Sequence, residues 1–305
     1  MEQSFLTTFA YAKINLALAI QGIREDGYHE LQSVMQSIAL HDVVRVRRHG
    51  EKVVCRCGAI SGPGNIAYKA AVLFLEQLGR FEGLEIEIEK RIPVQAGLAG
   101  GSADAAATLR LLNQIYGEPL SREELLTLAR RCGADVAFCL RGGTMWATGR
   151  GEQLKPLPLA PTMDLVLTKP FAGVNTREAY RRFDLVGQGG LLVEADWEEA
   201  LTQKSTRQVA NLLYNDFELA SAQMVPEILM LKRHLLEAEC YGALMSGSGS
   251  SVFGIAQGKQ HAQEVAGQLR KKGFKNVWVT RTVDAIDERG DICGETITTG
   301  NPRWV

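Results

Sequence analysis

The feature that most constrains the fold is a strand, a glycine-rich loop and a helix that follow one another without interruption. Apolar and acidic side chains alternate from Leu84 to Glu89, which is the period of a half-exposed strand. The loop Gly97-Leu98-Ala99-Gly100-Gly101-Ser102 comes next. An alanine-rich run then predicts a helix, with Ser102 near its N-cap and Gly117 just past its end. We therefore expect a helix N-terminus at the end of a strand.

Such a unit is suited to bind an anion. Glycines let the backbone approach a ligand closely, and the helix directs unpaired N–H groups and the positive end of its dipole toward the same point. The loop does not have the Walker pattern, since no Lys-Ser/Thr pair follows, nor the dinucleotide pattern Gly-x-Gly-x-x-Gly. The alternative interpretation is a glycine-rich turn that binds nothing.

Length and composition narrow the class of protein. A chain of 305 residues with 46% hydrophobic content can bury a substantial core, and this length is typical of two domains that share a cleft. The 34 Lys and Arg balance the 35 Asp and Glu, so nothing predicts binding to nucleic acid or to a membrane surface. No signal segment or long apolar run occurs. We expect a cytoplasmic protein with a small-molecule ligand.

The six cysteines do not form a metal-binding pattern. They include no C-x-x-C pair, and no histidine cluster lies near them in the sequence. We interpret them as reduced thiols, mostly in the core, and we name no metal ligand on the protein.

The N-terminal segment predicts a strand from Phe9 to Ile20, whose period of two places Lys13 and Asn15 on one face. A turn at 24–27 follows, and then Tyr28 and His29. A lone lysine in an apolar strand is usually an edge or snorkelling residue. Tyr28 and His29 are by default ordinary loop residues.

Further along, a capping box at Ser121 and Glu124 predicts a helix that ends at Gly133. Asp135 is then expected in the turn behind that helix, where a solvated carboxylate is the default interpretation. We also predict strands at 43–46 and 53–57, a helix at 65–78, and a short strand between Gly142-Gly143 and the turn at 148–151.

The second half of the chain approximates the order βαββαβ, a split ferredoxin-like unit with extra helices inserted. Strands are predicted at 164–168, 242–245, 251–256 and 276–282, and helices at 176–182, 196–202, 208–214, 226–239 and 260–272. A proline-bearing stretch, 154–161, indicates the crossing between domains. We therefore expect domains at 1–158 and 159–283, and a tail at 284–305 with little fixed structure.

A second glycine loop, Ser246-Gly247-Ser248-Gly249-Ser250, lies between two apolar strand-like segments. Taken alone, it would be interpreted as a flexible hairpin. Two such loops in one chain favour a shared cleft, because ligands often lie between domains that each supply a loop.

Together these motifs resemble the GHMP kinases, the family of galactokinase, homoserine kinase, mevalonate kinase and phosphomevalonate kinase. The lysine strand, the Pro-x-x-x-Gly-Leu-x-Gly-Gly-Ser loop and the Gly-Ser-Gly loop occur in the family's order, and the likeness runs from about Ala10 to Thr282. The resemblance implies an α+β, two-domain GHMP kinase fold: an N-terminal ribosomal-protein-S5-like domain and a C-terminal ferredoxin-like (split βαβ) domain. It also implies an ATP-dependent small-molecule kinase that uses Mg²⁺.

The same resemblance assigns roles to individual residues. Lys13 and Asp135 would be the catalytic pair. The residues that would hold ATP are Pro93, Val94, Gln95, Ala96, Gly97, Leu98, Ala99, Gly100, Gly101, Ser102 and Ala103. Those that would bind the acceptor substrate are Asn15, Tyr28, His29, Tyr180, Gly247, Ser248 and Gly249. Many relatives have a second serine where this chain has Ala103, so a hydroxyl contact from that position is absent.

One branch of the family is favoured by the run Asp26-Gly27-Tyr28-His29, supported by Gly133-Ala134-Asp135-Val136 and Asn215-Asp216-Phe217-Glu218. In that branch the acceptor is a cytidine-diphosphate-linked methylerythritol of the non-mevalonate isoprenoid pathway. The alternatives are a homoserine, mevalonate or sugar kinase of the same family, and a regulatory relative that binds nucleotide without catalysis. The sequence leaves open whether the protein is a monomer or a homodimer.

Overall fold

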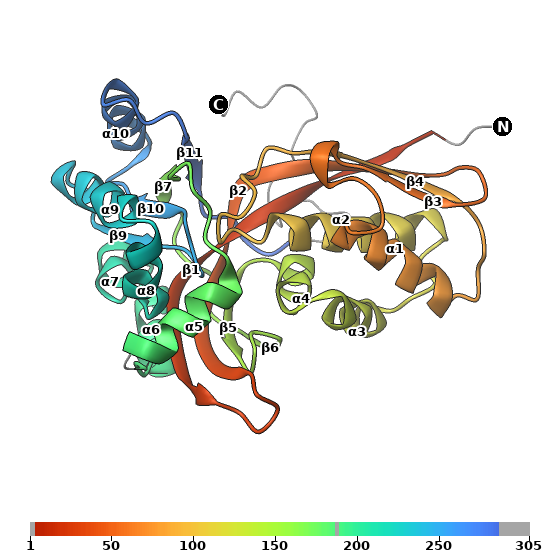
Figure 1. Ribbon diagram of the computed structural model, residues 1–305, viewed down its shortest axis with the longest axis horizontal. Coiled ribbons are helices and arrows are strands. Elements are labelled where there is room, and N and C mark those ends of the chain that lie inside the picture. Colours follow the sequence, from red (N-terminus) through yellow and green to blue (C-terminus); the bar gives the residue numbers. More distant parts are fainter. Residues whose placement is uncertain (1–3, 187–188, 287–305) are drawn as a thin grey trace.

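The computed structural model describes residues 4–186 and 189–286, which form two lobes built on two separate sheets (Figure 1). The first sheet has the strand order β3-β4-β2-β1-β8, and β5 pairs with β2 and β6. Its strands are β1 (Leu6–Ile23), β2 (His29–Arg48), β3 (Val53–Arg56), β4 (Leu84–Glu89), β5 (Thr144–Thr148), β6 (Gln153–Pro156) and β8 (Tyr214–Asn215).

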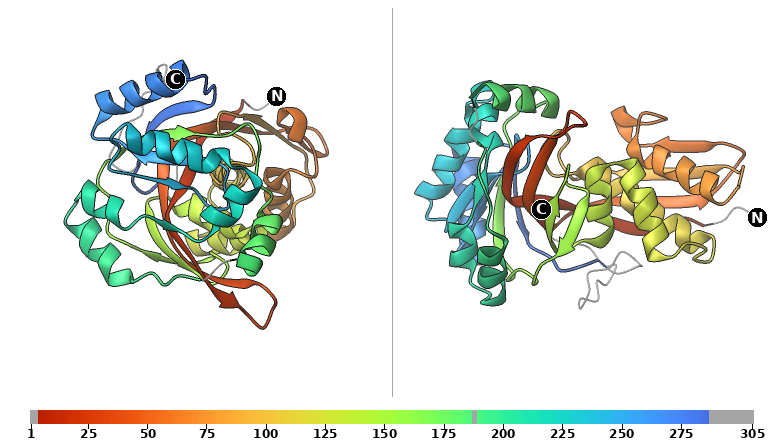
Figure 2. Two further views of the ribbon diagram at one scale, coloured as in Figure 1. Left: turned by 60° about the vertical axis from the view of Figure 1, so that its left-hand side comes forward. Right: turned by 90° about the horizontal axis from the view of Figure 1, so that it is seen from below.

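β1 and β2 are much longer than the sequence pattern predicted and form an antiparallel pair that runs through both lobes (Figures 1 and 2). The side chains of Ala10, Ala12, Ile14 and Leu16 belong to the first lobe's core, whereas those of Leu18 and Ile20 belong to the second. Because β1 is buried on both faces, the alternation of its side chains does not distinguish core-facing residues from solvent-facing ones. The register shifts at three places, including both sides of the segment 13–15.

Helices of the first lobe cover one side of its sheet (Figure 1). They are α1 (Ile66–Gln77), α2 (Gly100–Ile115), α3 (Arg122–Cys132) and α4 (Ala134–Arg141), and a 3₁₀ turn, η1 (Gly58–Ile60), precedes α1. The predicted capping box of α3 is confirmed: Ser121 accepts from the Glu124 amide, and the Glu124 carboxylate accepts from the Ser121 amide. Gly117, with φ of 76°, follows the end of α2 as expected.

Two local predictions are wrong. α2 begins at Gly100 rather than near Ser102, because Ala99 turns the chain in the left-handed conformation (φ 56°) and no side chain caps the helix. Asp135 lies in the first turn of α4 rather than in a turn, because Gly133 ends α3 in extended conformation and the chain re-enters a helix at once. Its carboxylate is therefore near a positive helix end.

The second lobe has the predicted ferredoxin-like sheet, in the order β11-β7-β10-β9 with all neighbours antiparallel. Its strands are β7 (Asp164–Thr168), β9 (Gly242–Met245), β10 (Val252–Ile255) and β11 (Val277–Arg281). Its helices are α5 (Thr176–Val186), α6 (Glu194–Thr202), α7 (Thr206–Asn211), α8 (Phe217–Met224), α9 (Glu227–Glu237) and α10 (Lys259–Lys271). The sequence pattern did not predict α8.

Short segments join the lobes. Tyr214, expected at the end of a helix, instead forms β8 together with Asn215, and the two residues pair in parallel with Ala17 and Leu18 of β1. At the other side, the Leu40 amide donates to the Thr280 hydroxyl at 3.0 Å. The boundary between residues 158 and 159 stays a prediction, because nothing in these pairings marks that position.

The chain beyond β11 returns to the first lobe. Ala285 forms a bridge with Gly142, and Ile286 is 3% exposed in a cluster with Tyr11 and Val283. The expectation of little fixed structure from residue 284 is therefore wrong for 284–286, because an apolar side chain there finds a buried place. Residues 287–305 of the expected tail lie outside the described residues. Within 4–186 and 189–286, no helix is long and apolar enough to cross a membrane.

Candidate active site

Lys13 is a buried cation in the middle of β1. Its Nζ donates to Asn15 Oδ1 at 2.7 Å and lies 3.7 Å from Asp135 Oδ2. The side chain of Lys13 is 6% exposed and that of Asp135 is 33% exposed. The predicted common face of Lys13 and Asn15 is thus confirmed, and a buried ammonium group faces a carboxylate that solvent or a ligand can reach.

Asn15 is held in one orientation by its neighbours. Its Nδ2 donates to Ser33 Oγ at 2.8 Å, and that hydroxyl donates to the carbonyl of Ala17 at 2.6 Å. With its amide nitrogen engaged on β2, Asn15 presents its Oδ1 acceptor to Lys13. The ammonium group is therefore fixed between a neutral acceptor and an anionic one.

The glycine loop lies against β1 and the second lobe through three consecutive carbonyls. Ala96 O accepts from the Ser251 amide at 3.2 Å, Gly97 O accepts from the Ser246 hydroxyl at 3.0 Å, and Leu98 O accepts from the Lys13 amide at 3.1 Å. Every second residue from Gln95 to Ala99 has positive φ, at 52°, 74° and 56°. Alternating backbone of this kind forms concavities lined by N–H groups that bind anions.

Gly97 is the point of closest approach between the two loops. A Cβ there would lie 2.0 Å from the carbonyl oxygen of Ser246, and φ is positive as well. Gly247 lies on the other side of the contact, where a Cβ would be 3.3 Å from Asn15 Oδ1. The structure therefore brings the two glycine loops, Lys13 and Asn15 to one place.

The second glycine loop is positioned by side chains that the sequence interpretation did not assign to the site. Asn215 Nδ2 donates to the carbonyls of Met245 and Gly247 at 2.7 and 2.9 Å, and Ser221 Oγ donates to Ser248 O at 2.8 Å. Ser246, the residue before the predicted trio 247–249, bonds to both Gly97 and the Asn15 amide. A signal for Asn215 existed in the run Asn215-Asp216-Phe217-Glu218.

The acceptor residues His29 and Tyr180 form an aromatic cluster where the β1–β2 hairpin passes α5 (Figure 1). Their rings stack with centroids 4.6 Å apart, and His29 Nε2 lies 2.7 Å from Asp184 Oδ1. Burial raises the pKa of Tyr180 to about 12, and the negative charge of Asp135 adds to the shift. The Tyr180 hydroxyl therefore lies within electrostatic reach of Asp135.

Tyr28 is separate from this cluster. The residue is 55% exposed, and the Arg150 guanidinium lies over its ring at 4.7 Å from the centroid. Of the predicted acceptor residues, Tyr28 therefore has the most open ring.

No group of three or more His, Cys, Asp or Glu in the described ranges could hold a metal ion. The five cysteines in those ranges are buried free thiols, as predicted. Burial raises the pKa of Cys55 and Cys240 to about 11, so these thiols are neutral at physiological pH.

Comparison with known proteins assigns the chain to a family. The GHMP kinases N terminal domain matches residues 65–143, and the GHMP kinases C terminal domain matches 197–275. The 4-diphosphocytidyl-2-C-methyl-D-erythritol kinase of Desulfitobacterium hafniense is 55% identical over 287 residues, which cover 94% of this chain and 97% of that protein. The chain belongs to the GHMP kinase family. It is therefore an ATP-dependent small-molecule kinase, as the sequence motifs predicted.

Other GHMP kinases are also similar to this chain in sequence or in structure. The 4-diphosphocytidyl-2-C-methyl-D-erythritol kinase of Pelotomaculum thermopropionicum is 42% identical, with 91% of this chain and 98% of that protein covered. A crystal structure of 4-(cytidine 5'-diphospho)-2C-methyl-D-erythritol kinase matches at a TM-score of 0.79 and 36% identity, over 91% and 99% of the two chains. Homoserine kinase from Cytophaga hutchinsonii, at 22% identity and a TM-score of 0.72 over 93% and 96% of the two chains, shows the shared fold alone.

Proposed function

We propose that this GHMP kinase transfers the γ-phosphoryl group of ATP to the 2-hydroxyl of 4-diphosphocytidyl-2-C-methyl-D-erythritol, a step of the non-mevalonate isoprenoid pathway. The similarity to kinases named for that acceptor supports the choice. The observation that carries the chemistry is the Lys13–Asp135 pair, 3.7 Å apart beside the glycine loop. An intact pair argues against the alternative of a catalytically silent relative.

In the proposed reaction, the 2-hydroxyl oxygen attacks the γ-phosphorus in line and the bond to the bridging β,γ-oxygen breaks, which releases ADP. Asp135 accepts the hydroxyl proton, and Lys13 stabilises negative charge on the attacking oxygen and the transferred group. Asn15 keeps the ammonium group in place through its 2.7 Å hydrogen bond. Since phosphoryl transfer depends mainly on positioning and charge stabilisation, these few residues suffice.

Nucleotide binding is proposed for residues 93–103, where alternating positive φ values and the start of α2 offer N–H groups to phosphates. Mg²⁺ usually keeps several waters and binds through substrate phosphates and one or two protein oxygens, so this site needs no closed protein cage. The ion would neutralise charge on the β- and γ-phosphates.

The acceptor is proposed to lie between the Gly247–Gly249 loop and the aromatic cluster of His29 and Tyr180, with Tyr28 at its outer end. An aromatic ring can stack on a base, and a ring nitrogen can read its edge. We also propose that the protein acts in the cytoplasm, as a monomer or a homodimer, without nucleic acid or membrane partners.

The test is ADP release from the purified protein with Mg-ATP and one acceptor at a time: the cytidyl compound, homoserine, mevalonate or galactose. We expect turnover with the cytidyl compound and negligible turnover with the others. Fast turnover of homoserine or mevalonate without the cytidyl compound would contradict the choice of acceptor but leave the kinase assignment intact. No ADP release with any of them, in a protein that binds ATP, would favour the silent relative.

A further inference from the structure

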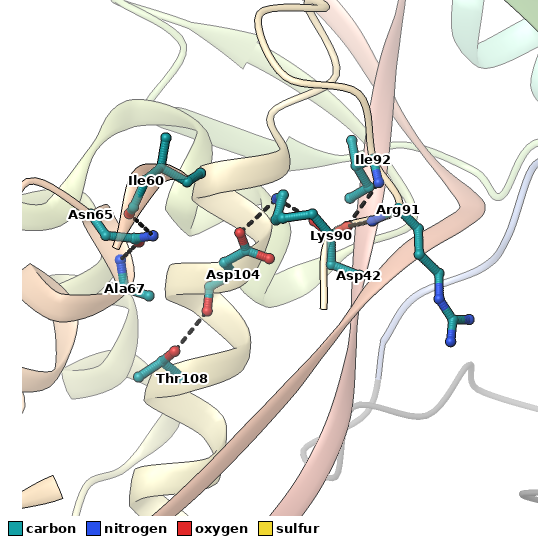
Figure 3. A network of polar contacts seen from close by, with 9 residues as sticks. All are labelled: Asp42, Ile60, Asn65, Ala67, Lys90, Arg91, Ile92, Asp104 and Thr108. Carbon is teal, nitrogen blue, oxygen red and sulfur yellow. Dashed lines mark hydrogen bonds and ion pairs between the residues drawn. The ribbon is translucent and has the colours of Figure 1, made fainter. Parts of the chain in front are cut away.

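A buried ionic cluster lies at the base of the glycine loop, outside the residues assigned to ATP or to the acceptor (Figure 3). Lys90, the first residue after β4, places its Nζ between the carboxylates of Asp42 on β2 and Asp104 on α2. The Lys90 Nζ to Asp104 Oδ2 distance is 2.7 Å. Both carboxylates are fully buried, whereas the lysine side chain is 19% exposed.

The cluster joins the two ends of the loop. Asp42 Oδ1 accepts from the backbone amides of Arg91 and Ile92, at 2.5 and 2.8 Å, where the chain leaves β4 toward the loop. Asp104 is in the second turn of α2, where the chain leaves the loop. Lys90 therefore ties the start of the loop to its end, and β2 supplies the fixed point.

Stability alone does not account for this arrangement. Two carboxylates share one ammonium group, so the cluster carries a buried excess of negative charge when both carboxylates are ionised. Asp104 Oδ1 accepts no hydrogen bond from the described residues. Replacing a buried ion pair by well-packed apolar residues of similar volume is often neutral or stabilising. Features that break such a rule at a cost in stability are expected at functional sites.

We propose that Asp104 is a positioning residue for ATP: paired with Lys90 and Asp42, its carboxylate holds the two ends of the phosphate-binding loop at a fixed separation. This inference rests on the proposed binding of ATP to residues 93–103. Gly100 lies directly over the cluster, since a Cβ there would be 3.3 Å from Lys90 Nζ and 3.0 Å from Ile92 Cγ2. A loosened cluster therefore displaces the backbone that leads into the first turn of α2.

The charge on Asp104 gives this role a pH signature. Burial raises the pKa of Asp104 to about 7, and the nearby carboxylate of Asp42 adds to the shift. The other titratable groups around it are Lys90 and three thiols: Cys57, Cys55 on β3 and Cys139 on α4. The two carboxylates outweigh burial and raise the pKa of Lys90, and burial raises the pKa of all three thiols. Asp104 is thus the group in the cluster expected to change charge near neutral pH.

The sign of the effect on ATP binding follows. Above about pH 8 Asp104 is ionised and its ion pair with Lys90 is complete, so the loop is held and the KM for ATP is lowest. As the pH falls through about 7 the carboxyl gains a proton, the ion pair weakens and the KM for ATP rises.

The sign of the effect on stability is the opposite. The pKa of Asp104 in the folded state, about 7, is above the ordinary value of 3.8. In the pH window between these two values, the folded protein therefore binds more protons than the unfolded chain. The contribution of Asp104 to stability therefore falls as the pH rises through the window.

The experiment compares wild type with Asp104→Asn, which keeps the size and an acceptor for Lys90 but removes the charge. At about pH 8.5 we expect the variant's KM for ATP to rise roughly fivefold, with kcat within about twofold and thermal stability equal to or above that of wild type, as for loss of one charge-assisted bond. Between about pH 8.5 and 6.5 the KM for ATP should rise in wild type and stay nearly constant in the variant.

Glu85→Gln is the matched control, because Glu85 on β4 is also a buried carboxylate, paired with Arg47 and Arg56 away from the loop. The Glu85→Gln variant should lose stability without a change in the KM for ATP. A change in the KM that arises from protonation of ATP itself should be the same in this variant and in wild type. Asp42→Asn, which keeps an acceptor for the two loop amides, is the second test variant and should also raise the KM for ATP.

An unchanged KM for ATP in Asp104→Asn at about pH 8.5, or the same pH dependence as wild type, would overturn the positioning role. Calorimetric titration with Mg-ATP alone separates this outcome from failure of the proposed function. If wild type binds ATP without phosphorylating the cytidyl acceptor, the acceptor assignment fails, and the dissociation constants for ATP still decide the role of Asp104.

Discussion

The two ends of the proposed site are built in different ways. At the nucleotide end, backbone groups form the binding surface, and buried neighbours hold them: Lys13, Ser246 and Ser251 bond to consecutive loop carbonyls. At the acceptor end, side chains form the surface and are more open, with Tyr28 55% exposed and the Asp184 side chain 43% exposed. The Lys13–Asp135 pair lies between the two ends.

This difference predicts different responses to substitution. A binding site made of backbone groups fails when an added side chain displaces the chain. The KM values for both substrates should then rise, because the two glycine loops are in contact. A side-chain site fails when one contact is removed, and only one substrate's KM then changes. The pair in the middle acts on the reacting atoms, so its loss should lower kcat.

The largest effect is expected for the pair. Asp135→Asn keeps the size of the side chain and removes the base, so kcat should fall by about 10²–10⁴ while the KM for ATP changes little. Lys13→Met should also lower kcat. Because both groups act on one transition state, the double variant should lose much less than the product of the two single losses. Steady-state kinetics with the cytidyl acceptor measures the kcat of the two single variants and of the double variant. A kcat for Asp135→Asn within about threefold of wild type would show that Asp135 does not act in the chemical step.

The next effect concerns the contact between the two glycine loops. In Gly97→Ala the new Cβ would lie 2.0 Å from the Ser246 carbonyl oxygen, at a φ of 74°. We expect the loops to separate, with the KM values for both substrates raised by roughly tenfold or more, since strain and a steric clash add. Gly267→Ala on α10 is the control, because nothing lies within 4 Å of the Cβ that it would add and the residue is outside the proposed site. Equal kinetic constants in the two variants would contradict a rigid contact between the loops.

The same contrast explains what sequence patterns revealed. Local patterns located β4, β7 and β9 at their observed bounds and predicted the glycine loop, because each is encoded in a short run of residues. They placed Asp135 in a turn because they do not show that an extended Gly133 leads directly into a second helix. They missed β8, a two-residue strand fixed only by its pairing with a distant strand.

Site residues follow the same rule. Lys13 and Asn15 were predicted together because a period of two places them on one face. The Lys90–Asp104 pair and the bonds of Asn215 to the second loop join residues 14 to 32 positions apart, and no spacing rule connects them. Contacts that depend on tertiary packing were therefore out of reach of sequence patterns.

At the acceptor end, Tyr180→Ala should raise the KM for the cytidyl acceptor by about ten- to a hundredfold, comparable to the loss of one or two aromatic contacts. The ring also supports His29 through their 4.6 Å stack, so both contacts with the base weaken together. The KM for ATP should stay within about twofold, which separates this end of the site from the nucleotide end. An acceptor KM equal to that of wild type would show that the base binds elsewhere.

The smallest effect is expected for Asp184, which we infer orients His29. An ionised carboxylate only accepts hydrogen bonds, so Asp184 Oδ1, 2.7 Å away, requires the proton on His29 Nε2 and leaves Nδ1 as the acceptor in the neutral ring. Asp184→Asn still offers an oxygen to Nε2 but removes the charge. Because the Asp184 side chain is 43% exposed, solvent screens that charge, and we expect the acceptor KM to rise only about threefold with kcat unchanged. Glu178→Gln, on the same helix and paired with Arg181 and Arg182, is the matched control and should leave the acceptor KM unchanged. If both variants raise it equally, the charge of α5 as a whole, rather than the orientation of His29, governs acceptor binding.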